Sequence, residues 1–158
     1  MKHTLSILLF ILFLFGCSEK RVLMDELINK GTKKTPIMYY EGEIFSGVGF
    51  DVWENGELEE ERNYKDGKKD GLRRGWHKNG QLAYEFNYKD GKFEGVSKYW
   101  FKSGQLEEEG FWKDGKKDGL WKIWERNAYG DPTGMRSEGN YKDGNKDGLW
   151  KEWYENGQ

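Results

Sequence analysis

The chain has 158 residues and a formal net charge of −2, with 34% charged and 16% aromatic residues. The small net charge gives no global signal for nucleic-acid binding, and a single cysteine excludes an internal disulfide. A charged content this high occurs in disordered chains, but aromatic residues that recur at a fixed period favour a folded repeat array. No helical period of 3.6 residues is present between residues 39 and 158.

Residues 1–16 are predicted to form a lipoprotein signal peptide. A charged start precedes an apolar run from Leu5 to Phe15, which is short for a transmembrane helix but fits a secretory signal. The run ends in Leu-Phe-Gly-Cys and resembles a bacterial lipobox, which implies a lipid on Cys17 after cleavage. Ser18 rather than Asp follows, so the resemblance implies the outer membrane in a Gram-negative cell. The alternatives are an uncleaved signal anchor or a buried cysteine.

Residues 17–36 are predicted to be a polar tether that holds the rest of the chain off the membrane. Asp25 is suited to cap one helical turn in this tether, and Gly31 to end it. Residues 37–158 are predicted to be the folded part, with about four and a half repeats and the last one incomplete. They begin with a degenerate half-repeat, as expected of a terminal unit that caps an array.

The folded part is organised around the sequence K-D-G-K-K-D-G at residues 65–71. Variants of it return at residues 89–95 and 113–119, each 24 residues on, and at 142–148 after a further 29. Asp-Gly tolerates positive φ and favours tight hairpin turns. Because a second polar turn of the Asn-Gly type lies between successive K-D-G turns, the segments between them are predicted to be short antiparallel strands.

Two lengths are compatible with the second turn, and they place the side chains differently. A two-residue loop at Asn79-Gly80 places His77 and Leu82 on the same face. The tryptophans that recur at one position of successive repeats, the tryptophan column, then lie on the other face: Trp76, Trp100, Trp124 and Trp153. A three-residue loop also includes Lys78 and has Gly80 in the left-handed region. It places Trp76 and Leu82 on the same face. We favour the three-residue loop.

The three-residue loop predicts which side chains share a face. It gathers one set of apolar residues: Leu72, Trp76, Leu82, Tyr84, Phe86 and Tyr88. It also places Lys98 opposite Glu108, and Arg73 opposite Glu85 on the other face, which are favourable cross-strand pairs. The other face then carries further aromatic residues beside a glutamate column: Glu61, Glu85, Glu109 and Glu138.

Two kinds of column are candidates for structural and functional roles. The predicted repeat-core columns are Leu72, Trp76, Leu82, Tyr88, Trp100, Leu106, Trp112, Leu120, Trp124, Tyr141 and Trp153. A basic column precedes the tryptophans by two residues: Arg74, Lys98, Lys122 and Lys151. Such a stripe is a candidate surface for lipid headgroups or an acidic partner. The alternative is that the aliphatic stems cover the apolar columns while the charges stay in water.

No catalytic residue, cofactor or metal site is predicted. His77 is the one histidine beyond the signal segment, and with a lipidated Cys17 it cannot form a nucleophilic triad. Residues 143–148 follow the first half of an EF-hand loop, but Lys151 and Tyr154 stand where further calcium ligands are needed. We therefore expect a protein that is not an enzyme and does not bind nucleic acid.

The units N-Y-K-D-G-K-K-D-G-L at residues 63–72 and G-L-W-K-E-W-Y-E-N-G-Q at 148–158 resemble the MORN repeat variant family, which includes bacterial YwqK-type proteins labelled as antitoxins. The resemblance covers residues 39–158. It implies an all-β, antiparallel hairpin array in a single twisted sheet, which serves as a protein-binding or scaffolding surface. We expect a lipid-anchored protein with an unidentified protein partner. An antitoxin-like binder of a toxin and a lipid-headgroup or glycan-binding module are the alternatives.

The last repeat is predicted to stop inside its second turn, at residues 155–157. Trp150, Trp153 and Tyr154 would then lie on or beside an open sheet edge, which tends to recruit another strand. Either the chain is shorter than its relatives, or this edge is used for self-association or for pairing with a partner.

Overall fold

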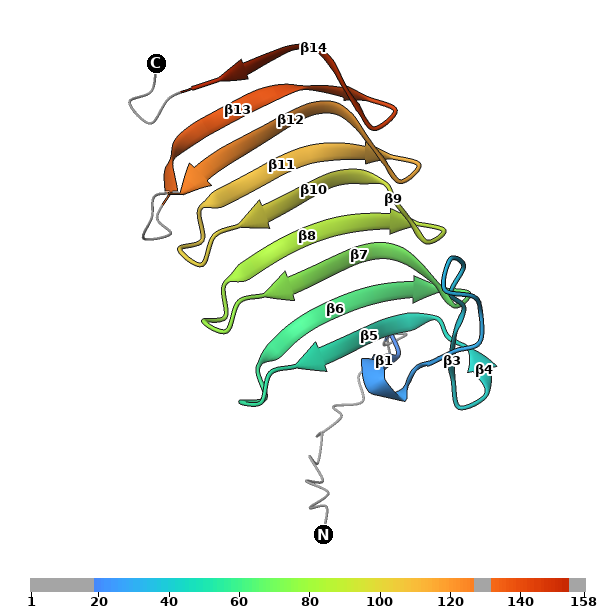
Figure 1. Cartoon of the computed structure of the whole chain (residues 1–158). Helices are drawn as coiled ribbons and strands as arrows, with labels where there is room; N and C mark the ends of the chain where they lie inside the picture. The colour runs from blue at the N-terminus through green and yellow to red at the C-terminus, as the bar shows by residue number, and fades with distance from the viewer. Residues whose placement is uncertain (1–18, 127–131, 154–158) are drawn as a thin grey trace.

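The computed structural model describes residues 19–126 and 132–153, and most of them belong to one large sheet. The sheet has 11 strands. They are β1 (Arg21–Leu23), β5 (Gly47–Val52), β6 (Leu58–Lys65), β7 (Lys68–Trp76), β8 (Leu82–Lys89), β9 (Lys92–Phe93), β10 (Gly95–Trp100), β11 (Leu106–Lys113), β12 (Lys116–Arg126), β13 (Pro132–Lys142) and β14 (Asn145–Glu152). From β5 to β14 they follow one another in chain order as antiparallel neighbours, except that β8 pairs with both the short β9 and β10 (Figure 1). The predicted all-β hairpin array is confirmed.

The K-D-G turns are two-residue hairpins, as their sequence predicts. Asp66 and Gly67 have φ values of 49° and 75°, both in the left-handed region that a type I′ turn requires. The aspartates of the other three K-D-G turns have φ values between 50° and 52°. Glu41 and Gly42, in the degenerate half-repeat, have φ values of 51° and 89°. The same turn geometry is therefore used from the first unit to the last described one.

The second turn has the three-residue loop that we favoured. The backbone N–H of His77 donates to the carbonyl of Gln81 at 2.8 Å, and the N–H of Gly80 donates to the carbonyl of His77 at 2.8 Å. Gly80 has a φ of 79°. The loops at residues 54–56 and 102–104 are closed by the same pair of bonds. As expected, Trp76 lies opposite Leu82.

A bulge after this loop makes the rest of the face prediction wrong. Trp76 pairs with Leu82, but Gly75 pairs with Tyr84, so Ala83 is an extra residue on its strand. One extra residue moves every later side chain to the other face. Tyr84, with Phe86 and Tyr88 beyond it, therefore lies on the face opposite Trp76. The bulge recurs at the equivalent positions of the other hairpins.

The sheet consequently has two unlike faces. The aromatic face carries Tyr64, Tyr84, Phe86, Tyr88, Tyr99, Trp112, Trp121, Tyr141 and Trp150. The ladder face carries Leu72, Arg74, Trp76, Leu82, Glu85, Val96, Lys98, Trp100, Leu106, Glu109, Leu120, Lys122 and Trp124. The predicted repeat-core columns are thus divided between the two faces, and Trp153 directly follows β14.

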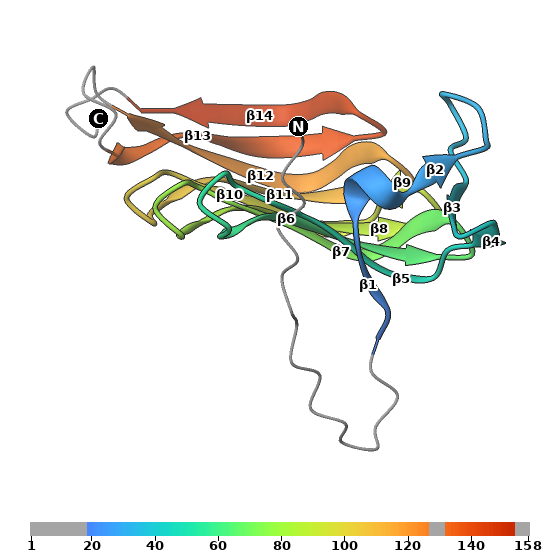
Figure 2. The same cartoon turned by 90° about the horizontal axis from the view of Figure 1, so that it is seen from below.

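The segment predicted to be a tether is part of the fold. β1 pairs in parallel with β5; the short 3-10 helix η1 (Met24–Glu26) follows, then β2 (Ile28–Asn29), β3 (Met38–Tyr40) and β4 (Glu43–Ile44), which form a three-stranded sheet. Figure 2 shows η1 and β2 to one side of the large sheet. Val22 and Leu27 are buried against Phe45 and Tyr64. The tether prediction is wrong because these apolar side chains cover the first strands.

The predicted signal peptide and Cys17 lie outside the described residues. Among the residues that are described, no helix is both long enough and apolar enough to span a membrane. The predicted end of the last repeat, at residues 155–157, is also outside them, and β14 is the last strand described.

Candidate functional site

Charged side chains form one row across the ladder face, from β6 to β14. Cross-strand partners in this row alternate in sign: Glu61, Arg74, Glu85, Lys98, Glu109, Lys122, Glu138 and Lys151. The row exists because each β-bulge brings the glutamate column to the same face as the basic column. We call it the charge ladder.

The charge ladder corrects the prediction of a basic stripe. Arg74 Nε donates to Glu85 at 2.7 Å, Lys122 lies 3.7 Å from Glu109, and Lys151 lies 3.3 Å from Glu138. Lys98 has a glutamate on each neighbouring strand, Glu85 and Glu109, and neither Glu108 nor Arg73 pairs as the sequence suggested. Because opposite charges alternate strand by strand, the row has no single sign that would attract an anionic surface.

An exposed apolar patch lies beside the charge ladder on β10, β11 and β12. Val96 is 48% exposed, Phe111 40% and Leu120 47%. Together with the Glu109–Lys122 pair they line a hollow of about 250 Å³. The patch interrupts the repeat, because the positions equivalent to Phe111 are asparagines: Asn63, Asn87 and Asn140. The sequence contains the signal for this patch, a single aromatic residue at a position where the other repeats have asparagine. The patch was not predicted from it.

The loop edge of the sheet has a second hollow, around Trp53. It is an open hollow of about 360 Å³, and its lining includes Trp53, Trp76, His77 and Tyr84. Lys78 Nζ lies 5.2 Å from the centre of the Trp53 ring, and both border an adjoining hollow of about 420 Å³. The indole N–H of Trp53 is buried and has no hydrogen-bond partner in the described structure.

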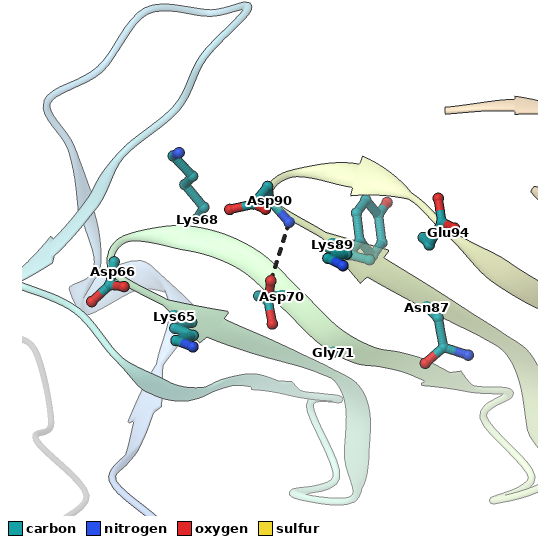
Figure 3. A pocket seen from close by; sticks show the side chains of 10 residues that line it. Lys65, Asp66, Lys68, Asp70, Gly71, Asn87, Lys89, Asp90 and Glu94 are labelled. Carbon is teal, nitrogen blue, oxygen red and sulfur yellow. Dashed lines mark hydrogen bonds between the residues drawn. The ribbon is translucent and has the colours of Figure 1, made fainter. Parts of the chain in front are cut away.

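The opposite edge, formed by the K-D-G turns, has a groove of about 510 Å³ lined by lysines and carboxylates (Figure 3). Its acidic groups are used to join successive turns. The backbone N–H of Asp90 donates to Asp70 Oδ2 at 3.1 Å, and that of Asp114 donates to Glu94 Oε2 at 2.9 Å. The second acidic residue of the motif K-D-G-K-K-D-G is therefore a link between repeats, which explains why Asp or Glu occupies it.

The aromatic face is packed within itself. Rings on successive strands touch, with centroids 4.5 to 5.8 Å apart, in the order Tyr88, Phe93, Trp112, Trp121, Tyr141 and Trp150. Trp121 is only 1% exposed. It lies on Gly110, where an added Cβ would be 2.1 Å from the indole, and Lys117 Nζ covers its ring at 3.6 Å from the centroid. These ring contacts stabilise the sheet, and Trp112, Tyr141 and Trp150 remain half-buried.

A buried carboxylate on the aromatic face is also committed to structure. Glu60 accepts hydrogen bonds from Arg62 Nε at 2.6 Å and from Arg73. Burial by itself would raise the pKa of Glu60, but the hydrogen bonds from Arg62 and Arg73 outweigh it and lower the pKa. With two guanidinium groups fixed on it, this carboxylate stays ionised and is poorly suited to accept a proton in catalysis.

The fold and the ladder face define a class: a single-layer array of β-hairpin repeats that presents a regular, solvent-exposed surface. The model of the MORN repeat variant family matches the chain at residues 47–66, 69–90, 93–114 and 146–158. The chain belongs to this family. MORN repeats are commonly protein-binding or membrane-binding modules. No curated protein matches the sequence.

Proposed function

We propose that the chain is a non-enzymatic, lipid-anchored repeat protein whose ladder face binds a protein partner at the bacterial cell envelope. The observation that supports the proposal is the exposed patch of Val96, Phe111 and Leu120 around a hollow of about 250 Å³. An exposed apolar patch rimmed by charged groups is typical of protein–protein contacts. The hollow accepts an aliphatic or aromatic side chain of the partner.

The charge ladder favours a protein partner over anionic lipid headgroups. A polybasic surface gains about 1 kcal/mol per Lys or Arg near an anionic membrane, but the cations here are paired with Glu85, Glu109 and Glu138. A protein surface with its own alternating charges matches this row, and misaligned partners meet like charges. The ladder therefore contributes selectivity, and the apolar patch contributes affinity.

Site-specific cross-linking in cells tests the partner proposal. A photoreactive amino acid in place of Val96 is expected to give a discrete cross-linked species, and one in place of the exposed Lys116, at the start of β12, is not. The variant Phe111→Asn restores the residue of the equivalent positions, so it is expected to keep the fold and to lose the species. Cross-linking that is absent at Val96, or unchanged by Phe111→Asn, would reject the ladder face as the binding surface.

The anchor is tested separately at Cys17. Several acyl chains give stable membrane attachment, whereas one gives only marginal binding. Metabolic labelling with a fatty acid is expected to mark the wild-type chain and to disappear in Cys17→Ser. Labelling that survives the substitution would contradict the lipoprotein proposal and would not test the partner proposal.

A glycan-binding role is the second candidate, and the hollow around Trp53 favours it. Aromatic rings offer apolar surfaces to the C–H faces of a pyranose, and Trp53 and Trp76 both line this hollow. Co-sedimentation with purified peptidoglycan is expected to fall in Trp53→Ala and to be unchanged in Phe111→Asn. Equal sedimentation of both variants and the wild type would remove this candidate.

A further inference from the structure

We propose that Asn55, in the loop between β5 and β6, is a site of spontaneous covalent modification that converts its side-chain amide to a carboxylate. The chemistry needs only water. The backbone nitrogen of Gly56 attacks Cγ of Asn55, and a glycine at this place leaves the nitrogen sterically open. The chain contains a matched reference, because Asn79 and Gly80 occupy the same positions in the next loop.

The glycine N–H and the asparagine Oδ1 make equivalent hydrogen bonds in the two loops. The backbone N–H of Gly56 donates to Trp53 at 2.8 Å, and that of Gly80 donates to His77 at 2.8 Å. Oδ1 of Asn55 accepts from the next-but-one backbone N–H at 3.0 Å, and Oδ1 of Asn79 does so at 3.2 Å. Both asparagines are exposed. These shared bonds slow both reactions to a similar degree.

The partner of the side-chain nitrogen differs. Nδ2 of Asn55 donates to the carboxylate of Glu57 at 2.9 Å, within its own exposed loop. Nδ2 of Asn79 donates to the backbone carbonyl of Lys102 at 2.8 Å, in the loop of the next repeat. Attack requires the amide to rotate toward the glycine nitrogen. A bond to a flexible carboxylate restrains this rotation weakly, whereas a bond to a backbone carbonyl in a closed loop restrains it strongly. Asn55 is therefore the reactive member of the pair.

The step balances with water alone. A bond forms between the Gly56 nitrogen and Cγ of Asn55, while the Gly56 N–H proton passes to solvent. The bond from Cγ to Nδ2 breaks, and Nδ2 takes up a proton and leaves as ammonia. Water then opens the cyclic imide. Opening at Cγ gives aspartate, and opening at the backbone carbonyl carbon gives isoaspartate. Either product adds a negative charge beside Lys78 in the hollow of about 420 Å³ that Asn55 lines.

The test is a time course on the full chain at mildly alkaline pH, folded and in urea, with peptide mapping of both asparagines. The ratio of the Asn55 rate to the Asn79 rate is expected to be roughly 2- to 10-fold higher in the folded chain than in urea, the factor that one hydrogen bond supplies. An equal ratio in the two states, or a faster reaction at Asn79, would overturn the proposal.

A variant separates this explanation from general loop mobility. Glu57→Ala removes the partner of Nδ2 and is expected to speed conversion at Asn55 while leaving Asn79 unchanged. The matched control, Gln81→Ala, alters the equivalent residue of the next loop and is expected to change neither rate, because Gln81 contributes its backbone N–H. An Asn55 rate that Glu57→Ala leaves unaltered would also overturn the proposal.

Discussion

The two faces of the sheet carry similar apolar residue types but bury them to different extents. On the aromatic face, Trp121 lies flat on Gly110, beneath Lys117, and is almost completely buried although no second layer of the described structure covers it. On the ladder face, its neighbour Leu120 stands nearly half exposed. Both residues belong to β12, one position apart. In the middle of this sheet the most deeply buried side chain is therefore on the aromatic face, while the patch around Leu120 on the ladder face is exposed to solvent.

The difference shows how a single sheet is stabilised. A glycine on one strand makes room for an aromatic ring from the next, and the ring in turn buries its neighbour. Gly75 with Tyr84, Gly110 with Trp121 and Gly139 with Trp150 all follow this rule. The ladder face obtains little from its ion pairs, since exposed pairs contribute about 0 to 1 kcal/mol each. We therefore expect substitutions to be costly on the aromatic face and mild on the ladder face.

The largest expected effect is that of Trp121→Ala. Removing a fully buried tryptophan costs about 3 to 5 kcal/mol, and the ring contacts to Trp112 and Tyr141 are lost as well. Leu120→Ala, one residue away on the other face, is the control, and we expect it to cost about 1 kcal/mol or less. Urea unfolding measures both. Similar costs for the two variants would mean that the faces are energetically alike.

A smaller effect is expected for Gly110→Ala. The added methyl group would lie 2.1 Å from the indole of Trp121, and such overpacking costs about 1 to 3 kcal/mol. In a Trp121→Ala background the same substitution is expected to cost almost nothing, because the clash is gone. A double-mutant cycle measures this coupling, and a cost that is equal in both backgrounds would show that the glycine serves another purpose.

Low pH is expected to lower the free energy of unfolding because Glu60, on the aromatic face, becomes protonated. Because Arg62 and Arg73 lower the pKa of Glu60, the ionised group stabilises the fold above its ordinary pKa of 4.5, and this stabilisation is lost as the pH falls through the lowered value. Glu60→Gln is expected to cost roughly 1 to 2 kcal/mol at neutral pH and to flatten the loss of stability in acid. The exposed Glu57→Gln serves as control, and an unchanged acid slope in Glu60→Gln would contradict the assignment.

The smallest stability effect is expected on the charge ladder. Lys98→Glu would place three negative charges in a row, with Glu85 and Glu109 on the neighbouring strands. Like charges directly opposite cost roughly 0.2 to 1 kcal/mol, and salt should reduce that cost by screening. Lys113→Glu, on an exposed strand end, is expected to be neutral. Thermal unfolding at low and high salt checks both, and a cost that salt leaves unchanged would argue against the ladder.

The sequence by itself determined the local geometry of the repeat. Asp66-Gly67 adopts positive φ because few other pairs tolerate a type I′ turn, and Gly80 closes a three-residue loop for the same kind of reason. These preferences involve residues within a few positions of each other, so spacing and residue type were enough to predict hairpins, strand lengths and the Trp76–Leu82 pair. The family resemblance rested on the same local signals.

Only the tertiary structure decided which side chains share a face and where the folded unit begins. The bulge at Ala83 depends on how two strands fit together, and one extra residue moves Tyr84 and Phe86 to the other side. It also turns a predicted basic stripe into an alternating ladder. Val22 and Leu27 look like part of a polar linker until Phe45 and Tyr64 are brought beside them. Register and burial depend on contacts between residues distant in sequence, and local preference does not contain that information.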